Sequence, residues 1–196
     1  MPLEEAGDAE SMSATAATAI LRREHRLILR LLDAATDIGR HLLRGEPVSP
    51  TTLGEVMSFL GSFTNCCHEA KEEELLFPLL RSRSGCPDAV LERMAEEHAY
   101  ARALVQQMAE AADQYARGVD EAAWRWAEVI GRYAALLHSH VDRENEQVFR
   151  AADASLTAEE QQELAAAFEK LEAERLGAGQ SFQAHMERIL VSITAP

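Results

Sequence analysis

The chain carries one pattern of metal-ligand side chains twice. Each half has a Glu-His pair, and a His-x-x-x-Glu step follows 43 residues after the paired histidine in the first half and 42 residues after it in the second. Imidazole and carboxylate groups are ligands that proteins use for iron, manganese and zinc. The pattern consists of Glu24, His25, His68 and Glu72, and then of Glu97, His98, His140 and Glu144. This repetition predicts a metal centre to which both halves contribute.

The His-x-x-x-Glu step places its two side chains on one side of a helix. Residues four apart lie about 40° from eclipsed around the helix axis. His68 can therefore chelate one centre together with Glu72, and His140 can do so together with Glu144.

Turn-forming residues indicate the helices that carry these pairs. Gly45 and Gly118 are expected to end helices. Ser49 with Pro50, Pro87, and Asp120 are expected to start helices. The expected helices span residues 15–44, 50–80, 87–117 and 121–150.

The distances to the turns set the ligands at one height. His25 lies 19 residues before Arg44, and His68 lies 18 residues after Pro50. In the second pair of helices, His98 lies 19 residues before Arg117, and His140 lies 19 residues after Glu121. Antiparallel packing then brings the ligands together about midway along an up-down antiparallel four-helix bundle. The predicted fold class is all-α.

The ligand set narrows the choice of metal. Four imidazoles and two carboxylates without a thiolate exceed the needs of one tetrahedral zinc ion. They suit two iron or manganese ions, each bound by two histidines and bridged by Glu72 and Glu144. An oxo or hydroxo bridge would leave each ion an open position for a small molecule. Mn or Zn are expected substitutes for a pair of Fe ions.

Outside the bundle the sequence predicts two further regions. Residues 1–13 are acidic and small and are expected to be disordered. The bundle is assigned to residues 14–152. Residues 153–196 are expected to form a C-terminal helical extension that packs on the bundle or forms a homodimer surface. Its first helix starts with the capping-box signature Thr157-x-x-Glu160 and ends near Leu176, and a last segment spans 181–193.

Composition excludes several classes of partner. A formal net charge of −14 and a pI near 4.9 argue against nucleic acid and anionic membranes. The longest stretch without a charge, from Val56 to His68, is too short to cross a bilayer. No signal peptide is visible, and Cys66, Cys67 and Cys86 suit a reducing compartment, so a cytoplasmic location is expected.

The motifs resemble the hemerythrin-like, or HHE cation-binding, family over about residues 16–150. The resemblance rests on Arg23-Glu24-His25, the run from His68 through Glu72 to Pro78, Glu96-Glu97-His98, and the run from His140 through Glu144 to Phe149. It implies a four-helix bundle around a non-haem di-iron centre. The implied ligands are His25, His68, Glu72, His98, His140 and Glu144, in agreement with the spacing.

Two departures from the oxygen-carrying hemerythrins bear on function. Their second histidine, four residues after the third-helix ligand, is replaced here by Arg102, and their His-x-x-x-x-Asp step is replaced by His140-x-x-x-Glu144. Reversible oxygen carriage is therefore not expected. The resemblance implies redox chemistry with oxygen, peroxide or nitric oxide, for sensing, detoxification or iron storage and delivery. The alternatives are repair of iron-sulfur clusters and a metal-binding regulatory module without catalysis; a weak enzymatic activity stays open.

The remaining polar residues are assigned less specific roles. Glu24 and Glu97 turn away from the ligand side of their own helices and are interpreted as solvated charges, with a role in supporting a ligand left open. Glu73 and Glu74 are interpreted as solvated charges. Tyr133 is interpreted as a buried core residue. Three further histidines are read as surface or packing residues: His41, His138 and His185. Of Trp124 and Trp126, only one can face the core.

Overall fold

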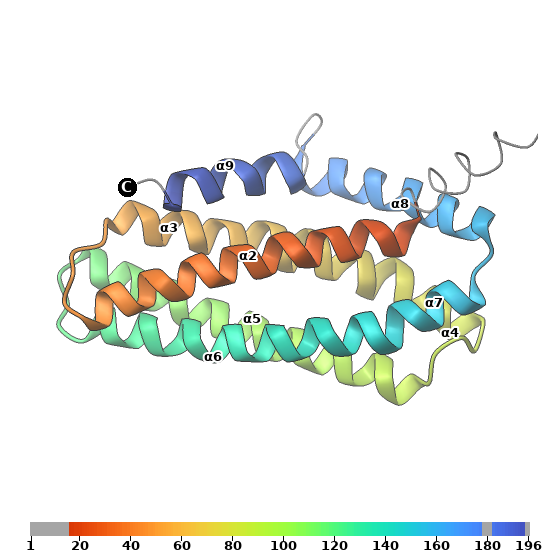
Figure 1. Ribbon diagram of the computed structural model, residues 1–196, viewed down its shortest axis with the longest axis horizontal. Helices are drawn as coiled ribbons and strands as arrows, with labels where there is room; N and C mark the ends of the chain where they lie inside the picture. The colour runs from red at the N-terminus through yellow and green to blue at the C-terminus, as the bar shows by residue number, and fades with distance from the viewer. Residues whose placement is uncertain (1–15, 178–181, 195–196) are drawn as a thin grey trace, which may run out of the picture.

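The computed structural model describes residues 16–177 and 182–194, and every element within these residues is helical. Four long helical rods lie antiparallel to their neighbours in an up-down bundle (Figure 1). The first rod is α2 (Ala17–Leu43), and the third is α5 (Asp88–Ala116). The all-α four-helix bundle is therefore confirmed. The expectation of disorder at residues 1–13 lies outside the described residues.

The second and fourth rods each combine several helical segments. The second consists of α3 (Pro50–Phe59), η1 (Leu60–His68), η2 (Lys71–Leu76) and α4 (Phe77–Ser82). The fourth consists of α6 (Ala122–Arg143), η3 (Glu144–Val148) and α7 (Phe149–Ser155). The η segments are π-helical, with hydrogen bonds from residue i to i+5, a geometry that is frequent at functional sites. Both rods extend beyond the expected ends near residues 80 and 150.

Most of the expected helix ends are confirmed. Gly45 and Gly118 have φ of 71° and 72°, which glycine adopts without the steric penalty of a Cβ. The Ser49 side chain accepts a hydrogen bond from the backbone N–H of Thr51. The prediction of Asp120 as a cap is wrong. The left-handed Glu121, with φ of 67°, occupies that position, because the turn after Gly118 is one residue longer than expected.

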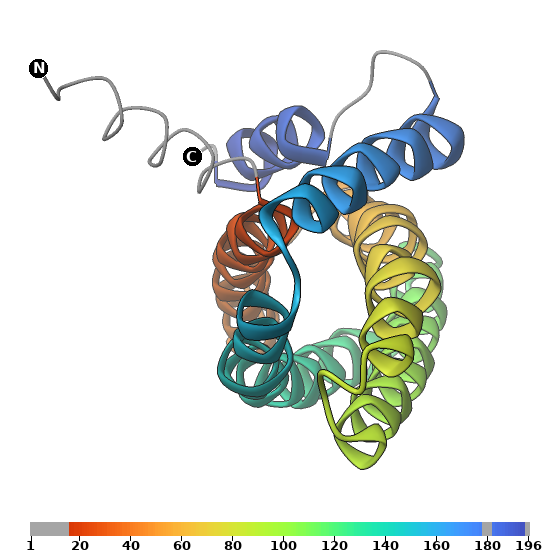
Figure 2. The ribbon, with the colours of Figure 1, turned by 90° about the vertical axis from the view of Figure 1, so that its right-hand side faces the viewer.

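Two C-terminal helices lie on one side of the bundle, as Figure 2 shows. The first, α8 (Ala158–Leu176), starts with the expected capping box between Thr157 and Glu160 and contacts α2 and both π-helical segments of the second rod. The second, α9 (Phe182–Thr194), contacts α2 and α3. Both α8 and α9 therefore pack on the bundle.

The apolar core forms two clusters with a polar layer between them. Along α2, Leu21 belongs to one cluster and Ile28 to the other, and His25 lies between them. Along α5, His98 likewise separates Met94 from Ala101. The predicted ligands therefore share one level of the bundle.

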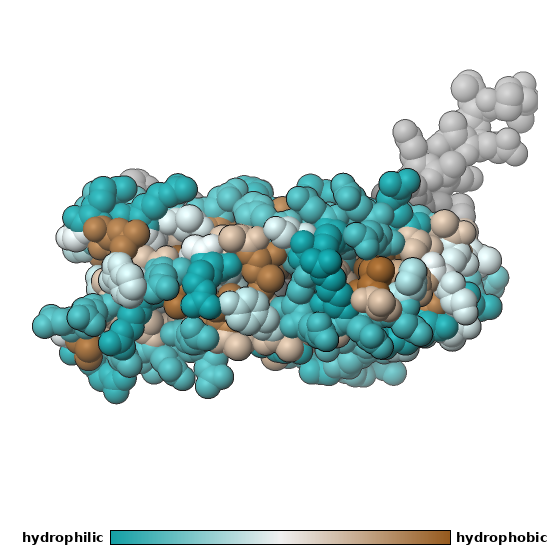
Figure 3. Space-filling view, turned by 90° about the horizontal axis from the view of Figure 1, so that it is seen from below, coloured by the Kyte–Doolittle hydropathy of each residue, from teal (hydrophilic) through white to brown (hydrophobic). Residues whose placement is uncertain are grey.

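Polar side chains cover most of one face of the bundle. Figure 3 shows that the face opposite α8 and α9 is mainly hydrophilic, with small scattered hydrophobic areas. Across the ranges 16–177 and 182–194, no helix combines the length and the apolar character that crossing a bilayer requires.

Candidate metal centre

All six predicted ligand residues lie in the polar layer and are buried. Each rod contributes at least one of them: His25 from α2, His68 and Glu72 from the second rod, His98 from α5, and His140 with Glu144 from the fourth rod. The most exposed of the six, His68, has only 4% of its surface accessible. Four chain segments far apart in sequence thus converge on one volume.

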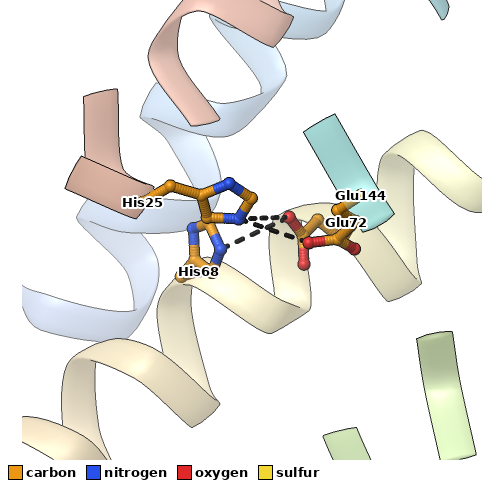
Figure 4. Close-up of side chains that lie close together, drawn as sticks. All are labelled: His25, His68, Glu72 and Glu144. Atoms are coloured by element: carbon orange, nitrogen blue, oxygen red, sulfur yellow. Dashed lines mark ion pairs between the residues drawn. The ribbon is translucent and has the colours of Figure 1, made fainter. Parts of the chain in front are cut away.

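Two imidazoles approach the carboxylates from one side of the layer. His25 Nε2 lies 3.2 Å from Glu144 Oε2 and 3.7 Å from Glu72 Oε1. His68 Nε2 lies 3.3 Å from Glu72 Oε1. Figure 4 shows both rings pointing toward the two carboxylates. These four side chains offer ligand atoms that all lie within 4.8 Å of one another.

The other two imidazoles complete the arrangement. His98 Nε2 lies 3.4 Å from Glu72 Oε2 and 4.0 Å from Glu144 Oε1. His140 Nε2 lies 3.2 Å from Glu144 Oε2 and 3.0 Å from His98 Nε2. Each carboxylate therefore faces imidazoles of both pairs, which is the placement that a ligand shared by two cations needs.

The donor atoms fit a cation. Within the described part of the chain, both nitrogens of His25 and all four carboxylate oxygens of Glu72 and Glu144 are buried without a hydrogen bond of good geometry. A buried anionic group without such partners is strongly unfavourable unless a cation compensates it. The residues thus have the burial, the chemistry and the unused lone pairs that a metal ion requires.

The two carboxylates also perturb each other. Burial, followed by the nearby Glu144 charge, holds the pKa of Glu72 well above its usual range. Burial opposes ionisation of Glu144 as well, but the adjacent His140 and His25 hold the pKa of Glu144 well below its usual range. Ionising both carboxyl groups costs free energy, because two negative charges this close together repel each other. A bound cation would remove that conflict.

Three carboxylates outside the six predicted ligands form hydrogen bonds with three of the four imidazoles. Glu24 Oε2 lies 2.8 Å from His68 Nδ1, and Glu97 Oε2 lies 2.9 Å from His140 Nδ1. Glu73 Oε1 lies 2.8 Å from His98 Nδ1. An ionised carboxylate only accepts, so Nδ1 donates in each pair, and this turns Nε2 toward the other predicted ligands.

The interpretation of Glu24, Glu97 and Glu73 as solvated charges is therefore wrong. Glu24 has only 5% of its surface exposed. A residue that precedes a ligand does turn away from that ligand, but in a bundle it turns toward a neighbouring rod. Glu24 therefore reaches His68, and Glu97 reaches His140. The Glu-His dipeptide occurs in both halves of the sequence, and this repetition could have indicated the role of the two glutamates. Glu74, which is paired with Arg175, remains on the surface.

A small cavity opens beside the four imidazoles. Its volume is about 10 Å³, on the order of the room that one water-sized sphere occupies. The other lining residues are Ile28, Thr64, Glu69, Leu137 and Val141. Thr64 Oγ1 and Glu69 Oε1 are buried there without a hydrogen bond to any described residue. The cavity admits only a very small molecule.

Comparison with protein families gives a match over most of the chain. Residues 16–152 match the family model described as the hemerythrin HHE cation binding domain. The chain belongs to the hemerythrin HHE cation-binding family. The comparisons with curated proteins and with solved structures gave no match. The family match includes all six predicted ligands and ends within α7, so α8 and α9 lie outside it.

One departure from the oxygen-carrying hemerythrins has a structural role in this HHE protein. Arg102 stands four residues after His98, where the resemblance placed their additional histidine. Its guanidinium lies 2.6 Å from Glu69 Oε2 and 2.9 Å from Glu73 Oε1. It therefore organises carboxylates beside the cavity and is not available as a neutral ligand.

The remaining assignments from the sequence are mostly confirmed. Tyr133 and Trp126 are fully buried, whereas Trp124 is exposed. His41 and His138 are about half exposed, and the side chain of His185 lies outside the described residues. Cys66, Cys67 and Cys86 are free thiols, and burial raises the pKa of Cys67 to about 12. Lys71, which is fully buried, was not recognised from the sequence.

Proposed function

We propose that this hemerythrin HHE protein binds two non-haem iron ions and reacts at them with oxygen, peroxide or nitric oxide. In the proposal His25 and His68 bind one ion, and His98 and His140 bind the other. Glu72 and Glu144 are shared by both ions. Bound iron would supply a change of oxidation state and a coordination position for a small ligand.

One observation carries this proposal. Both carboxylates lie within 4.0 Å of imidazole nitrogens from the two histidine pairs. A single tetrahedral zinc ion needs only four protein ligands, so it would leave part of this buried set without a partner. Two oxygen- and nitrogen-bound ions use the whole set.

The cavity supports a very small substrate. Its volume of about 10 Å³ beside the four imidazoles is on the order of one water-sized sphere, which favours a ligand of very few atoms. We therefore place a diatomic molecule or peroxide there. The roles that follow are gas or peroxide sensing, detoxification, or iron storage and delivery, in a domain of residues 14–152 with the helical extension of residues 153–196.

The chemistry is tested by mixing the iron-loaded full chain with hydrogen peroxide or with nitric oxide. The absorption spectrum and the peroxide concentration are followed together. We expect a spectral change that His68→Ala and Glu144→Ala abolish. The matched control is His138→Ala, because His138 is a half-exposed histidine that points away from the centre. Sustained consumption of peroxide indicates an enzyme, and a single change without turnover indicates a sensor. No spectral response of the iron-loaded protein to either reagent would refute the proposed chemistry.

A further inference from the structure

The C-terminal helix α8 reaches the candidate metal centre through a buried lysine. Lys71 lies on the second rod, between His68 and Glu72 on one side and α8 on the other, and none of its surface is exposed. Its ammonium nitrogen lies 2.5 Å from Glu24 Oε1 and 2.6 Å from Glu172 Oε2. Glu172 belongs to α8.

These contacts continue to a predicted ligand. The second oxygen of Glu24 accepts the 2.8 Å hydrogen bond from His68 Nδ1. An unbroken series of polar contacts therefore runs from α8 to the imidazole that faces Glu72: Glu172, Lys71, Glu24 and His68. The family match ends at residue 152, so Glu172 is not part of the family domain.

Packing fixes the position of Glu172. The apolar side of α8 carries Leu164, Phe168 and Leu171, and all three are buried. Leu164 and Phe168 belong to the core cluster that also contains Leu21, Leu76 and Phe149. Beyond Glu172, Arg175 pairs with Glu74 of the second rod at 2.7 Å. The packing of α8 and the 2.6 Å ion pair together place the Glu172 carboxylate beside Lys71.

Charge gives the contact a specific effect on Glu24. The buried ammonium group of Lys71 lies between two carboxylates, 2.5 Å from Glu24 and 2.6 Å from Glu172. Glu172 and Glu24 share this one cation. Without Glu172, Lys71 would lose one of its two carboxylate partners at ion-pair distance, would interact more strongly with Glu24, and would reduce the negative charge that Glu24 presents to His68. A weaker acceptor at Nδ1 makes Nε2 a weaker ligand.

We propose that Glu172 is a positioning residue of the metal centre, which acts through Lys71 and Glu24 on the orientation and ligand strength of His68. The metal part of this proposal rests on the proposed function. The C-terminal extension is then a component of the site rather than an addition to a complete domain.

The first test compares metal affinity in full-length proteins. Glu172→Gln keeps the shape of the side chain and removes its charge. The matched control is Glu174→Gln, because Glu174 lies on the same helix, is 65% exposed and pairs with Lys170 at 4.0 Å. We expect Glu172→Gln to lower the affinity for Fe²⁺, measured by competition with a chelator, about tenfold. The control should keep the wild-type affinity.

The second test reads the imidazole directly in metal-free protein. Nitrogen-15 spectra of the histidine rings, assigned with a His68→Gln variant, report which nitrogen carries the proton. We expect the His68 signals of Glu172→Gln to move and those of Glu174→Gln to stay. Glu172→Asp retains the charge but is one methylene shorter, so it should shift both readouts in the same direction by a smaller amount and serves if Glu172→Gln does not fold.

Unchanged iron affinity and unchanged His68 signals in the folded Glu172 variants would overturn the proposal, even if their melting temperature falls. That result would make Glu172 a packing contact of α8 alone. If the wild-type chain binds no metal, the proposed function fails, and the nitrogen-15 spectra still decide whether Glu172 acts on His68.

Discussion

Glu24 accepts a hydrogen bond from His68 on the neighbouring rod, although its neighbour in the chain is His25. Glu97 has the same relation to His140 and its neighbour His98. Each Glu-His dipeptide thus supplies a predicted ligand from its histidine and orients another predicted ligand with its glutamate. The two histidines of each pair, His25 with His68 and His98 with His140, are thus linked in two ways. They face the same candidate centre, and the glutamate that precedes one histidine in the chain accepts a hydrogen bond from the other.

Glu97→Gln should weaken metal binding while the fold is retained. The amide still reaches His140 Nδ1 but is a poorer acceptor than a carboxylate, so His140 Nε2 becomes a weaker ligand. We expect a 10- to 100-fold loss of iron affinity, as such supporting contacts typically contribute. The exposed neighbour Glu96 provides the control, and Glu96→Gln should bind iron as the wild type does. Equal affinities in the two variants would contradict an orienting role for Glu97.

Glu24→Gln should affect stability more than Glu97→Gln does. Glu24 compensates the buried Lys71 ammonium, whereas Glu97 is only partly buried and faces the more accessible Arg143. Removing one partner of a buried ion pair typically costs about 3–5 kcal/mol. Urea unfolding of the metal-free variants measures the difference. A free energy of unfolding equal to that of Glu97→Gln would show that Lys71 does not depend on Glu24.

Glu72→Gln should stabilise the metal-free protein and abolish metal binding. The pKa of Glu72 is raised in the folded state, so above its unfolded pKa, near 4.5, its ionisation opposes folding. The amide removes that penalty, and we expect a gain of about 1–2 kcal/mol at neutral pH that disappears at a pH below the unfolded pKa. Thermal unfolding with and without iron measures both effects. Glu74→Gln, at a half-exposed position, should change neither. A less stable metal-free Glu72→Gln protein would contradict this account.

Gly39→Ala should destabilise the bundle relative to Gly131→Ala. A Cβ at Gly39 would lie 3.0 Å from Ile130 Cγ2 and 3.4 Å from the backbone of Ala127, where α2 and α6 approach closely. A Cβ at Gly131 would meet nothing within 4 Å. The Gly131 variant should gain about 1 kcal/mol from helix propensity, and the Gly39 variant should lose that gain to overpacking. Equal melting temperatures of the Gly39→Ala and Gly131→Ala variants would show that α2 and α6 can move apart at Gly39 without loss of stability.

Much of the bundle was predictable because its signals are local. Gly45, Ser49 and the Thr157 capping box act through their own backbone, and these helix ends were found where expected. The equal distances from each ligand to its turn then determined the common level of the six predicted ligands. Asp120 failed as a cap because the neighbouring Glu121 took the left-handed position of the turn.

The contacts around the predicted ligands were harder to predict because they depend on packing between rods. The π-helical segments at Leu60–His68, Lys71–Leu76 and Glu144–Val148 leave no mark in the spacing of the ligands. The roles of Glu24 and Lys71 depend on which rods are neighbours and on how far each is rotated. The contact with Glu172 depends further on where α8 lies, and a capping box does not determine that.

The central claim is that four imidazoles and two carboxylates hold a pair of metal ions. The most direct test is iron analysis of the loaded full chain combined with anomalous diffraction at the iron edge. The account predicts two irons per chain within the polar layer, one beside His25 and His68 and the other beside His98 and His140. A single ion, ions bound elsewhere, or a loaded crystal with no anomalous peak among these side chains would contradict it.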